Sequence, residues 1–247
     1  MFLLALSLSA QEDVKLARNI VMFVVDDQGR DAGCYGNAAI QTPHLDALAK
    51  DGTRFDYAFC TTASCSASRS VILTGLHNHA NGQYGHQPSY HRFHTKDSVV
   101  SLPTWLSKAG YRTARIGKYH VAPEEIYPFD QHLTGNQGGS RNPVSMAEKC
   151  QPFINKDKSR PFFLYFCTSD PHRGGGYADE LPYKPNRFGN NQTYEGVKEV
   201  IYDPQEVLVP DYLPDSPECR AELAQYYQSV SRIDQGLGTL VQILKEA

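Results

Sequence analysis

Several features that would identify the class of a protein at once are scarce in this sequence. Its 247 residues include one Trp and three Met, and 24 Lys and Arg are nearly balanced by 27 Asp and Glu. The net charge of −3 provides no basic field, so composition does not favour a nucleic-acid partner. No apolar stretch is long enough to cross a bilayer, so we expect no transmembrane anchor. With 40% hydrophobic residues the chain can still bury a sizeable core, and we expect a globular protein.

Cysteine is too sparse for a disulfide scaffold. The six cysteines are Cys34, Cys60, Cys65, Cys150, Cys167 and Cys219. No two form a Cys-x-x-Cys pair, which argues against a structural zinc site. We therefore expect any disulfide to be incidental to folding.

The first ten residues are typical of a targeting segment. Residues 2–10 form a short apolar run ending in Ser-Leu-Ser-Ala, although the usual positive charge before such a run is missing. We expect residues 1–10 to be a signal-peptide remnant and the protein to be exported. The alternative is a hydrophobic N-terminus without a targeting role.

Apolar runs and helical patterns alternate along the chain. Strands are predicted at residues 19–25, 111–116 and 161–168, and helices at 101–109, at 220–247 and after Thr42-Pro43. In the helix at 101–109, Leu102, Trp105 and Leu106 share one face. The run at 19–25 is typical of a strand buried on both faces. This alternation predicts an α/β fold with a mainly parallel sheet flanked by helices.

The region before the last predicted helix has no clear period. Residues 174–217 are rich in Gly, Pro, Asn and Tyr, which is typical of a functional loop or an insertion. The following helix carries a stripe of apolar residues near the helical period. In an α/β alternation, a further strand would be expected after it.

All three predicted strands end in polar clusters, at the edge where open α/β sheets bind ligands. The clusters are Asp26-Asp27, Gly117-Lys118-Tyr119-His120 and Asp170-Pro171-His172-Arg173. Adjacent carboxylates could bind a hard cation, while Lys118, His120 and His172 could hold an anion or move protons. Each of these residues alone is more often structural, and their shared position is what indicates a site.

Cys65 lies at a predicted helix start, with Arg69 one turn later. A helix N-terminus and a nearby cation both favour an anionic centre, which is either a thiolate or a bound oxyanion. A helix with a partly buried cysteine is the plainer alternative.

Five of the nine histidines crowd into eighteen positions: His77, His79, His86, His91 and His94. His77-x-His79 could chelate a transition metal, but the spacing fits no tight zinc template. We favour pocket lining or loop structure for this group.

Cys65-Ser66-Ala67-Ser68-Arg69, followed by Leu73-Thr74-Gly75, resembles the signature of the sulfatase family, whose cysteine is oxidised to formylglycine. Further matching segments occur in the family's order: Asp26-Asp27, Thr42-Pro43-His44-Leu45-Asp46, Gly117-Lys118 and Asp170-Pro171-His172. The resemblance implies an alkaline-phosphatase-like fold and places residues 19–247 in the N-terminal part of the catalytic domain, with 174–217 as an irregular insertion.

The resemblance also implies the metal site and the maturation. Asp26, Asp27 and the modified Cys65 would bind one Ca²⁺. A formylglycine-generating or radical-type maturase would modify Cys65. Ala67 stands where most members have proline, and alanine is found there notably among substrates of the radical-type maturase.

By the same resemblance, Arg69 and Lys118 would anchor formylglycine and neutralise charge. His120 would act as the base that regenerates the aldehyde, and His172 would protonate the departing group. The aldehyde hydrate would attack sulfur, and inorganic sulfate would be released.

Segments including Asn81-Gly82-Gln83-Tyr84-Gly85-His86 and Asp203-Pro204-Gln205-Glu206 are similar to the heparan sulfamidase subgroup. The implied substrate is N-sulfated glucosamine or a related sulfated glycosaminoglycan sugar. The implied location is lysosomal in an animal and periplasmic or secreted in a bacterium. Three alternatives remain: a sulfate-ester sulfatase, a phosphatase or phosphonate hydrolase using Cys65 or Ser64 directly, and a non-catalytic glycan-binding protein.

The family's next strand carries an Asp-Asn pair that completes the metal site, and a C-terminal subdomain follows it. The printed sequence ends before both. We therefore expect a fragment or a truncated paralogue with little sulfohydrolase activity on its own, because calcium prefers six to eight oxygen ligands.

Overall fold

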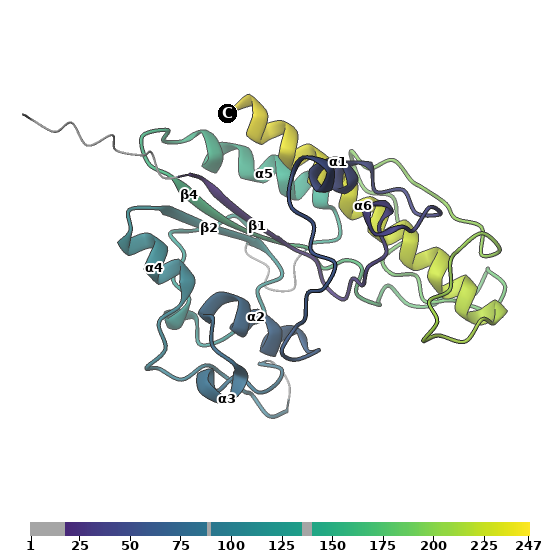
Figure 1. Ribbon diagram of the computed structural model, residues 1–247, viewed down its shortest axis with the longest axis horizontal. Helices are drawn as coiled ribbons and strands as arrows, with labels where there is room; N and C mark the ends of the chain where they lie inside the picture. The colour runs from purple at the N-terminus through teal and green to yellow at the C-terminus, as the bar shows by residue number, and fades with distance from the viewer. Residues whose placement is uncertain (1–17, 88–89, 135–139) are drawn as a thin grey trace, which may run out of the picture.

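The alternating segments fold into a parallel sheet between two layers of helices (Figure 1). The computed structural model describes residues 18–87, 90–134 and 140–247, so the expected targeting segment 1–10 lies outside the described residues. The strands are β1 (Ile20–Val24), β2 (Arg112–Gly117), β3 (Gln131–His132) and β4 (Phe162–Cys167). The α-helices are α1 (Pro43–Asp51), α2 (Cys65–Thr74), α3 (Asn78–Asn81), α4 (Leu102–Lys108), α5 (Pro143–Asn155) and α6 (Pro217–Glu246). Two short 3-10 helices are η1 (Gly33–Tyr35) and η2 (Glu124–Ile126).

The sheet has the strand order β1-β4-β2-β3, and every described strand pair is parallel. The predicted parallel α/β architecture is therefore confirmed. Val24 and Gly117 are both in register with Cys167, so three strands end side by side. The residues that follow these strands must then share one edge of the sheet.

The central strand β4 explains the two helical layers. Its side chains alternate between the two sheet faces, as they must in a strand. Phe162, Leu164 and Phe166 pack in the core that α5 and α6 cover. Phe163 and Tyr165 belong to the core on the opposite face, which α2 and α4 cover. A strand that is apolar on both faces is what such a three-layer arrangement requires.

One expectation about burial is wrong, and one apolar residue of a predicted helix lies at the surface. The strand at 19–25 exists as β1, but it lies at an edge of the described sheet, and its residues are half-buried rather than fully buried. Trp105 lies on α4, yet its exposed fraction is 57%. The ammonium of Lys108 lies 5.1 Å from the centre of the indole ring, so this aromatic side chain contacts a cation at the surface instead of the core.

Helix boundaries differ from the predicted ones in two places. The last helix begins at Pro217 rather than 220, because Ser216 caps it by accepting a hydrogen bond from Cys219 N at 3.3 Å. The sequence analysis misses α5, within which Pro143 and Pro152 both lie. Residues 174–217 are irregular as predicted, with one isolated bridge between Tyr177 and Asn186 in that stretch. None of the described helices is long and apolar enough to cross a bilayer.

Candidate active site

The polar clusters after β1, β2 and β4 converge as predicted. Asp26 N donates a 3.0 Å hydrogen bond to the carbonyl oxygen of Asp170, which joins the residues after β1 to those after β4. The turn after β2 requires Gly117, whose φ of 82° lies in the left-handed region. A Cβ atom at this position would lie 2.6 Å from Cε of Met146. This turn brings Lys118 to Asp26.

Asp26 is the charge centre of the site. Arg69 Nη2 donates to Asp26 Oδ1 at 3.0 Å, and Lys118 Nζ donates to Asp26 Oδ2. Arg69 Nη1 also donates to the carbonyl oxygen of Lys118 at 2.9 Å. Burial alone would raise the pKa of Asp26, but the hydrogen bond from Lys118 and the charges of Lys118 and Arg69 lower it overall. The two cations and one carboxylate therefore leave a net positive charge in a largely buried place.

Cys65 is the first residue of α2 and faces this charge centre. Its Sγ lies 4.0 Å from Asp26 Oδ2 and 3.6 Å from Lys118 Nζ. Burial raises the pKa of the Cys65 thiol, and the charge of Asp26 raises it further, against the opposing effect of Lys118. The thiol is therefore protonated at neutral pH. The prediction of a thiolate at this helix start is not supported, because burial and the carboxylate outweigh the cations.

His120 lies beside the thiol in an unusual backbone conformation, with φ of 59°. Its Nδ1 is buried and has no hydrogen-bond partner among the described residues. Burial lowers the pKa of His120 to about 4, with further lowering by the charges of Lys118 and His86. The ring is therefore neutral at neutral pH and can accept a proton.

Asp27 and His172 form the solvent-exposed side of the site. His172 Nε2 lies 3.7 Å from Asp27 Oδ2, and both side chains are about half exposed. One ligand atom each from Asp26, Cys65 and His172 fall within 4.8 Å of one another. Asp27, expected as a metal ligand, is not a member of this group and faces His172 instead.

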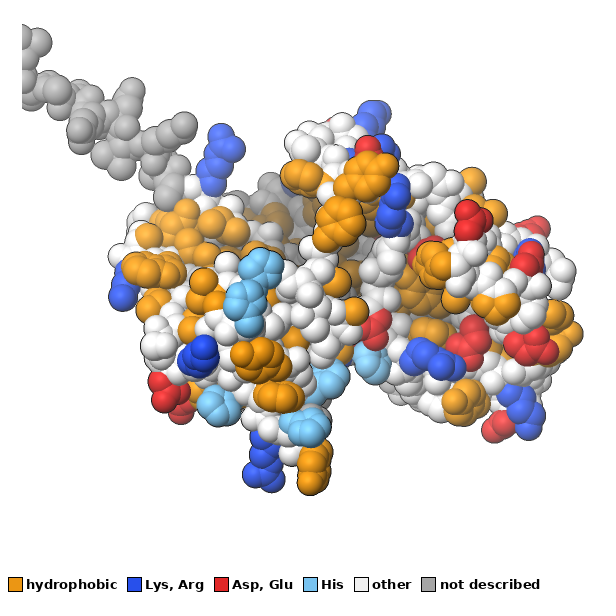
Figure 2. All heavy atoms as spheres, turned by 60° about the horizontal axis from the view of Figure 1, so that its bottom comes forward, with side chains coloured by type: hydrophobic (Ala, Val, Ile, Leu, Met, Phe, Trp, Pro, Cys, Tyr) orange, Lys and Arg blue, Asp and Glu red, His pale blue; other side chains and the backbone are white. Residues whose placement is uncertain are grey.

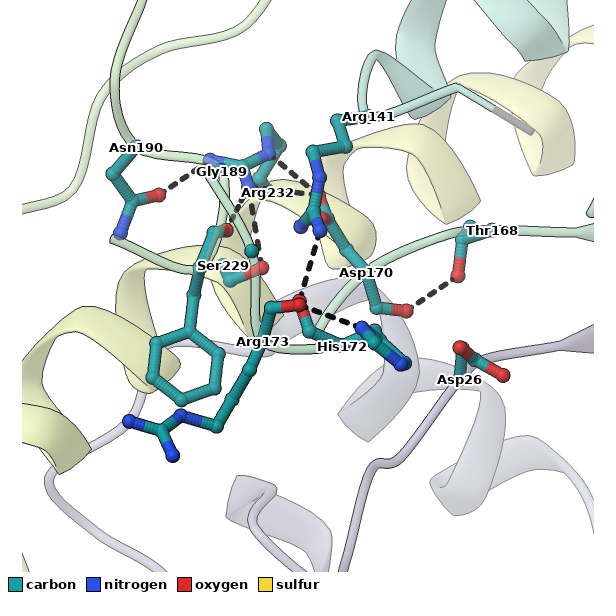
Figure 3. Close-up of polar contacts among 12 residues, drawn as sticks. Asp26, Arg141, Thr168, Asp170, His172, Arg173, Gly189, Asn190, Ser229 and Arg232 are labelled. Carbon is teal, nitrogen blue, oxygen red and sulfur yellow. Dashed lines mark hydrogen bonds and ion pairs between the residues drawn. The ribbon is translucent and has the colours of Figure 1, made fainter. Parts of the chain in front are cut away.

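Asp170 holds the residues around His172 in place (Figure 3). Its side chain is 1% exposed and lies between two guanidinium groups. Arg141 Nη1 donates to Asp170 Oδ1 at 2.5 Å, and Arg232 Nε donates to Asp170 Oδ2 at 2.8 Å. Arg141 Nη2 also donates to the carbonyl oxygen of His172 at 3.0 Å. The sequence analysis assigns Asp170 and the two arginines no role.

Two carboxylates of the site are ligands of the kind that a hard cation prefers. Asp26 and Asp27 offer carboxylate oxygens, which calcium prefers. Both oxygens of Asp26 already accept hydrogen bonds from cations, and a thiol is not a calcium ligand. The described residues therefore fit calcium in part, and an oxygen in place of the Cys65 sulfur would improve the fit.

Of the clustered histidines, His86 belongs to the site. Its ring stacks on His120 with 5.3 Å between centroids, while His77 and His79 stack on each other at 5.7 Å. Figure 2 shows several histidine side chains on the surface of the lobe that carries α2 and α3. His86 thus lies beside His120 at the site, a position that the sequence analysis did not recognise.

Comparison with known proteins agrees with this geometry. A family model described as Sulfatase matches residues 18–247. The chain belongs to the sulfatase family. This sulfatase chain is 43% identical over 238 residues to the human protein named N-sulphoglucosamine sulphohydrolase, covering 93% of the chain and 47% of that protein. It is 31% identical to an N-acetylglucosamine-6-O-sulfatase of Bacteroides thetaiotaomicron, covering 69% and 34%. The chain therefore spans less than half the length of both relatives.

Solved structures share the fold of this sulfatase chain. One, in complex with its substrate D-glucosamine-2-N,6-O-disulfate, has a TM-score of 0.63 at 22% identity and covers 93% of this chain and 62% of that chain. A phosphonate monoester hydrolase of Agrobacterium radiobacter has a TM-score of 0.66 at 16% identity, covering 93% and 60%. At these identities the structural likeness concerns the fold alone.

Proposed function

We propose that the protein removes sulfate from N-sulfated glucosamine or a related heparan-type sugar, with Cys65 oxidised to formylglycine. The observation that carries this proposal is the position of Cys65 at the start of α2, with its sulfur 3.6 Å from Lys118 Nζ and 4.0 Å from Asp26 Oδ2. The 43% identity to a protein named for hydrolysis of N-sulfoglucosamine supports the substrate.

Arg69 and Lys118 stabilise the charge that develops on the sulfuryl oxygens. Both cations are largely buried, with exposed side-chain fractions of 3% and 11%. In such a poorly solvated place a fixed cation stabilises an anionic transition state more strongly than it would in water. Because Asp26 orients both cations, they need no reorganisation during the reaction.

The two histidines move protons at opposite sides of residue 65. The neutral ring of His120 acts as a base on the hydroxyl of residue 65, since its pKa of about 4 leaves it unprotonated at neutral pH. His172 lies on the exposed side, where the leaving nitrogen departs, and donates a proton to it. Asp27 Oδ2 lies 3.7 Å from His172 Nε2 and orients the imidazole for this step.

Two groups complete the site. Formylglycine at position 65, made by a formylglycine-generating or radical-type maturase, supplies a hydrated aldehyde as the nucleophile. Asp26, Asp27 and the oxygen of modified residue 65 would hold one Ca²⁺, which would supply positive charge for the sulfuryl oxygens. Export to the lysosome, the periplasm or the medium accompanies this function.

A cavity next to the site is a suitable place for the sugar. It has a volume of about 490 Å³ and contains Asp27 in its wall. Arg173, Tyr212 and Tyr226 also line it. Tyr212 belongs to the irregular region 174–217, and Tyr226 lies on α6. Aromatic faces and a guanidinium group are suited to a sugar ring that carries sulfate or carboxylate groups.

The alternative of a phosphatase with Cys65 as the direct nucleophile is disfavoured by the site. A thiol nucleophile must ionise, and burial raises the pKa of Cys65. The same observation leaves a sulfate-ester sulfatase possible, since that activity uses the same oxidised residue.

The test is sulfate release by the complete gene product, because the chain spans less than half the length of its relatives. The protein is co-expressed with a maturase, supplied with Ca²⁺ and given glucosamine N-sulfate, glucosamine 6-sulfate and p-nitrophenyl phosphate. We expect the fastest release from the N-sulfate, no release by Cys65→Ala, and a loss of about 10²–10⁴-fold in His120→Gln. His77→Gln serves as the control. Faster hydrolysis of the phosphate ester, or activity in Cys65→Ala, would overturn the proposal.

A further inference from the structure

Cys65 also belongs to a second cluster, with two histidines in place of Asp26 and His172. One ligand atom each from Cys65, His86 and His120 fall within 4.8 Å of one another. The three residues come from different parts of the chain, namely the start of α2, the loop after α3 and the turn after β2. The fold, rather than a local sequence motif, brings them together.

The ligand atoms of this cluster differ in kind from those of the proposed calcium site. A thiolate sulfur and two imidazole nitrogens are ligands for zinc and related soft or borderline cations, whereas calcium takes oxygen. We propose that the unoxidised protein binds one Zn²⁺ through Cys65, His86 and His120. A water molecule in the fourth position would complete a tetrahedron.

The distances require only a small adjustment. Ligand atoms around a tetrahedral zinc ion lie roughly 3.3–3.6 Å apart, given bonds of about 2.0 Å to nitrogen and 2.3 Å to sulfur. All ligand atoms of the cluster lie within 4.8 Å of one another, so no pair must approach by more than about 1.5 Å. His86 is exposed at the surface and can turn to provide this change. His120 has a buried Nδ1 without a hydrogen-bond partner in the described part of the chain, so no bond at that atom holds its ring.

Nearby charges do not prevent binding. Lys118 Nζ lies 3.6 Å from the sulfur, but its charge is paired with Asp26. Arg69 is paired with the same carboxylate, so one positive charge remains, and the thiolate that forms on zinc binding offsets it. As the sulfur–zinc bond forms, the thiol proton leaves to solvent, so zinc gains a thiolate ligand and one proton is released.

This site exists only before maturation. Oxidation of Cys65 to an aldehyde removes the sulfur atom and with it the only thiolate ligand of the cluster. The same residue therefore provides a soft-cation site in the thiol form and an oxygen ligand in the oxidised form. This inference concerns the unmodified chain and does not depend on the proposed sulfatase activity.

The test uses the 247-residue chain expressed without any maturase, with the mass of the Cys65 peptide confirming an unmodified thiol. Zn²⁺ affinity is measured by competition with a chromophoric chelator, and Co²⁺ is added separately as a spectroscopic probe. We expect one tight equivalent and a thiolate-to-cobalt charge-transfer band. Cys65→Ser should abolish the band, and His86→Gln should weaken zinc binding by at least about tenfold, since even the loss of a residue that only supports a ligand costs about 10–100-fold.

Two matched controls separate this site from other thiols and histidines. Cys60→Ser removes an exposed cysteine, and His77→Gln removes a histidine of the same surface group. Both should leave affinity and spectrum unchanged, and circular dichroism checks that every variant is folded. Unchanged affinity in folded His86→Gln, a cobalt spectrum without the sulfur band, or the absence of tight zinc binding would overturn the inference. None of these results bears on whether a maturase oxidises Cys65, which is measured separately.

Discussion

At the residue scale, Asp170 joins several segments of the chain, although the sequence analysis assigned it no role. Its buried carboxylate accepts hydrogen bonds from Arg141, before α5, and from Arg232, on α6. Arg232 in turn donates to Asn190 Oδ1 at 2.6 Å and to the carbonyl oxygen of Phe188 at 2.9 Å. One carboxylate therefore connects the end of β4 to two helices and to the irregular region.

Asp170→Asn should be strongly destabilising. It removes the negative charge between two guanidinium groups, and breaking a buried ion pair in this way costs about 3–5 kcal/mol. Asp215→Asn is the matched control, because Asp215 pairs with Arg220 while 61% exposed, and such a pair contributes about 0–1 kcal/mol. Urea unfolding of both variants measures the difference. Equal losses in the two would show that the Asp170 network does not hold the fold.

Asp26 should make stability depend on pH in a defined direction. Burial favours its neutral form, but Lys118 and Arg69 lower the pKa of Asp26 below the ordinary 3.8. A carboxylate with a lowered pKa stabilises the fold above its unfolded pKa, and this contribution disappears as the pH falls through the folded pKa.

The contribution of Asp26 is obtained by comparing the wild type with Asp26→Asn in the presence of EDTA. The difference in unfolding free energy between the two should be constant from pH 6 to about pH 4.5 and should shrink at lower pH. Urea unfolding across this range measures it. A difference that stays constant down to pH 3 would show that Asp26 is not ionised through its pairs with Lys118 and Arg69.

Which site residues could be foreseen depended on their sequence neighbours. Asp26, Lys118 and His120 follow apolar strands directly, so their shared sheet edge could be predicted from order alone. His86 could not, because it lies in a loop and is brought near His120 and Cys65 only by the fold. The pKa of Cys65 also could not be foreseen, since it depends on burial and on a carboxylate distant in sequence.

At the element scale, the contact between α5 and α6 depends on the absence of a side chain. Gly236 on α6 lies against the first residue of α5, and a Cβ atom there would lie 2.7 Å from the carbonyl carbon of Pro143. Backbone atoms cannot turn aside as a side chain can. Glycine at position 236 therefore allows α5 and α6 to pack closely. This explains its place in the middle of a long helix, although glycine lowers helix stability there by about 1 kcal/mol relative to alanine.

Gly236→Ala should destabilise the protein by about 1–3 kcal/mol, despite the better helix propensity of alanine. Gly238→Ala on the same helix is the control, since the added Cβ would meet only the ring of His44, which is exposed and can turn away. Thermal unfolding of both variants measures the contrast. A Gly236→Ala variant as stable as Gly238→Ala would show that α5 and α6 are not in close contact there.

The elements themselves were foreseen to different extents. β4 is apolar throughout, and α6 carries an apolar stripe with the helical period. The bounds of both elements were therefore predicted to within a few residues. α5 was missed because Pro152 within it suggests a break, whereas the helix is held by Asn142, which caps it by accepting from Ser145 N at 3.0 Å. The burial of β1 was overestimated, because an apolar run does not reveal whether a strand is central or at an edge.

At the scale of the whole molecule, the sheet edge gathers residues that are far apart in sequence around one sulfur atom. Asp26 and Lys118, and also His86 and His120, lie close to Cys65. This arrangement surrounds one half-buried, protonated thiol, which the proposed oxidation would convert to the reactive centre. The central claim is that oxidation of this cysteine is what makes the protein a sulfatase.

The most direct measurement is the mass of the tryptic peptide 55–69, which contains both Cys60 and Cys65, after co-expression with each class of maturase, with fragment ions assigning any change to one of the two cysteines. We predict that at least one class converts Cys65 to formylglycine, seen as the loss of the thiol and the gain of an aldehyde that reacts with a hydrazide probe. Cys60 and Cys150 should stay unmodified in the same digest. A Cys65 that remains a thiol with both the formylglycine-generating and the radical-type maturase would contradict this account.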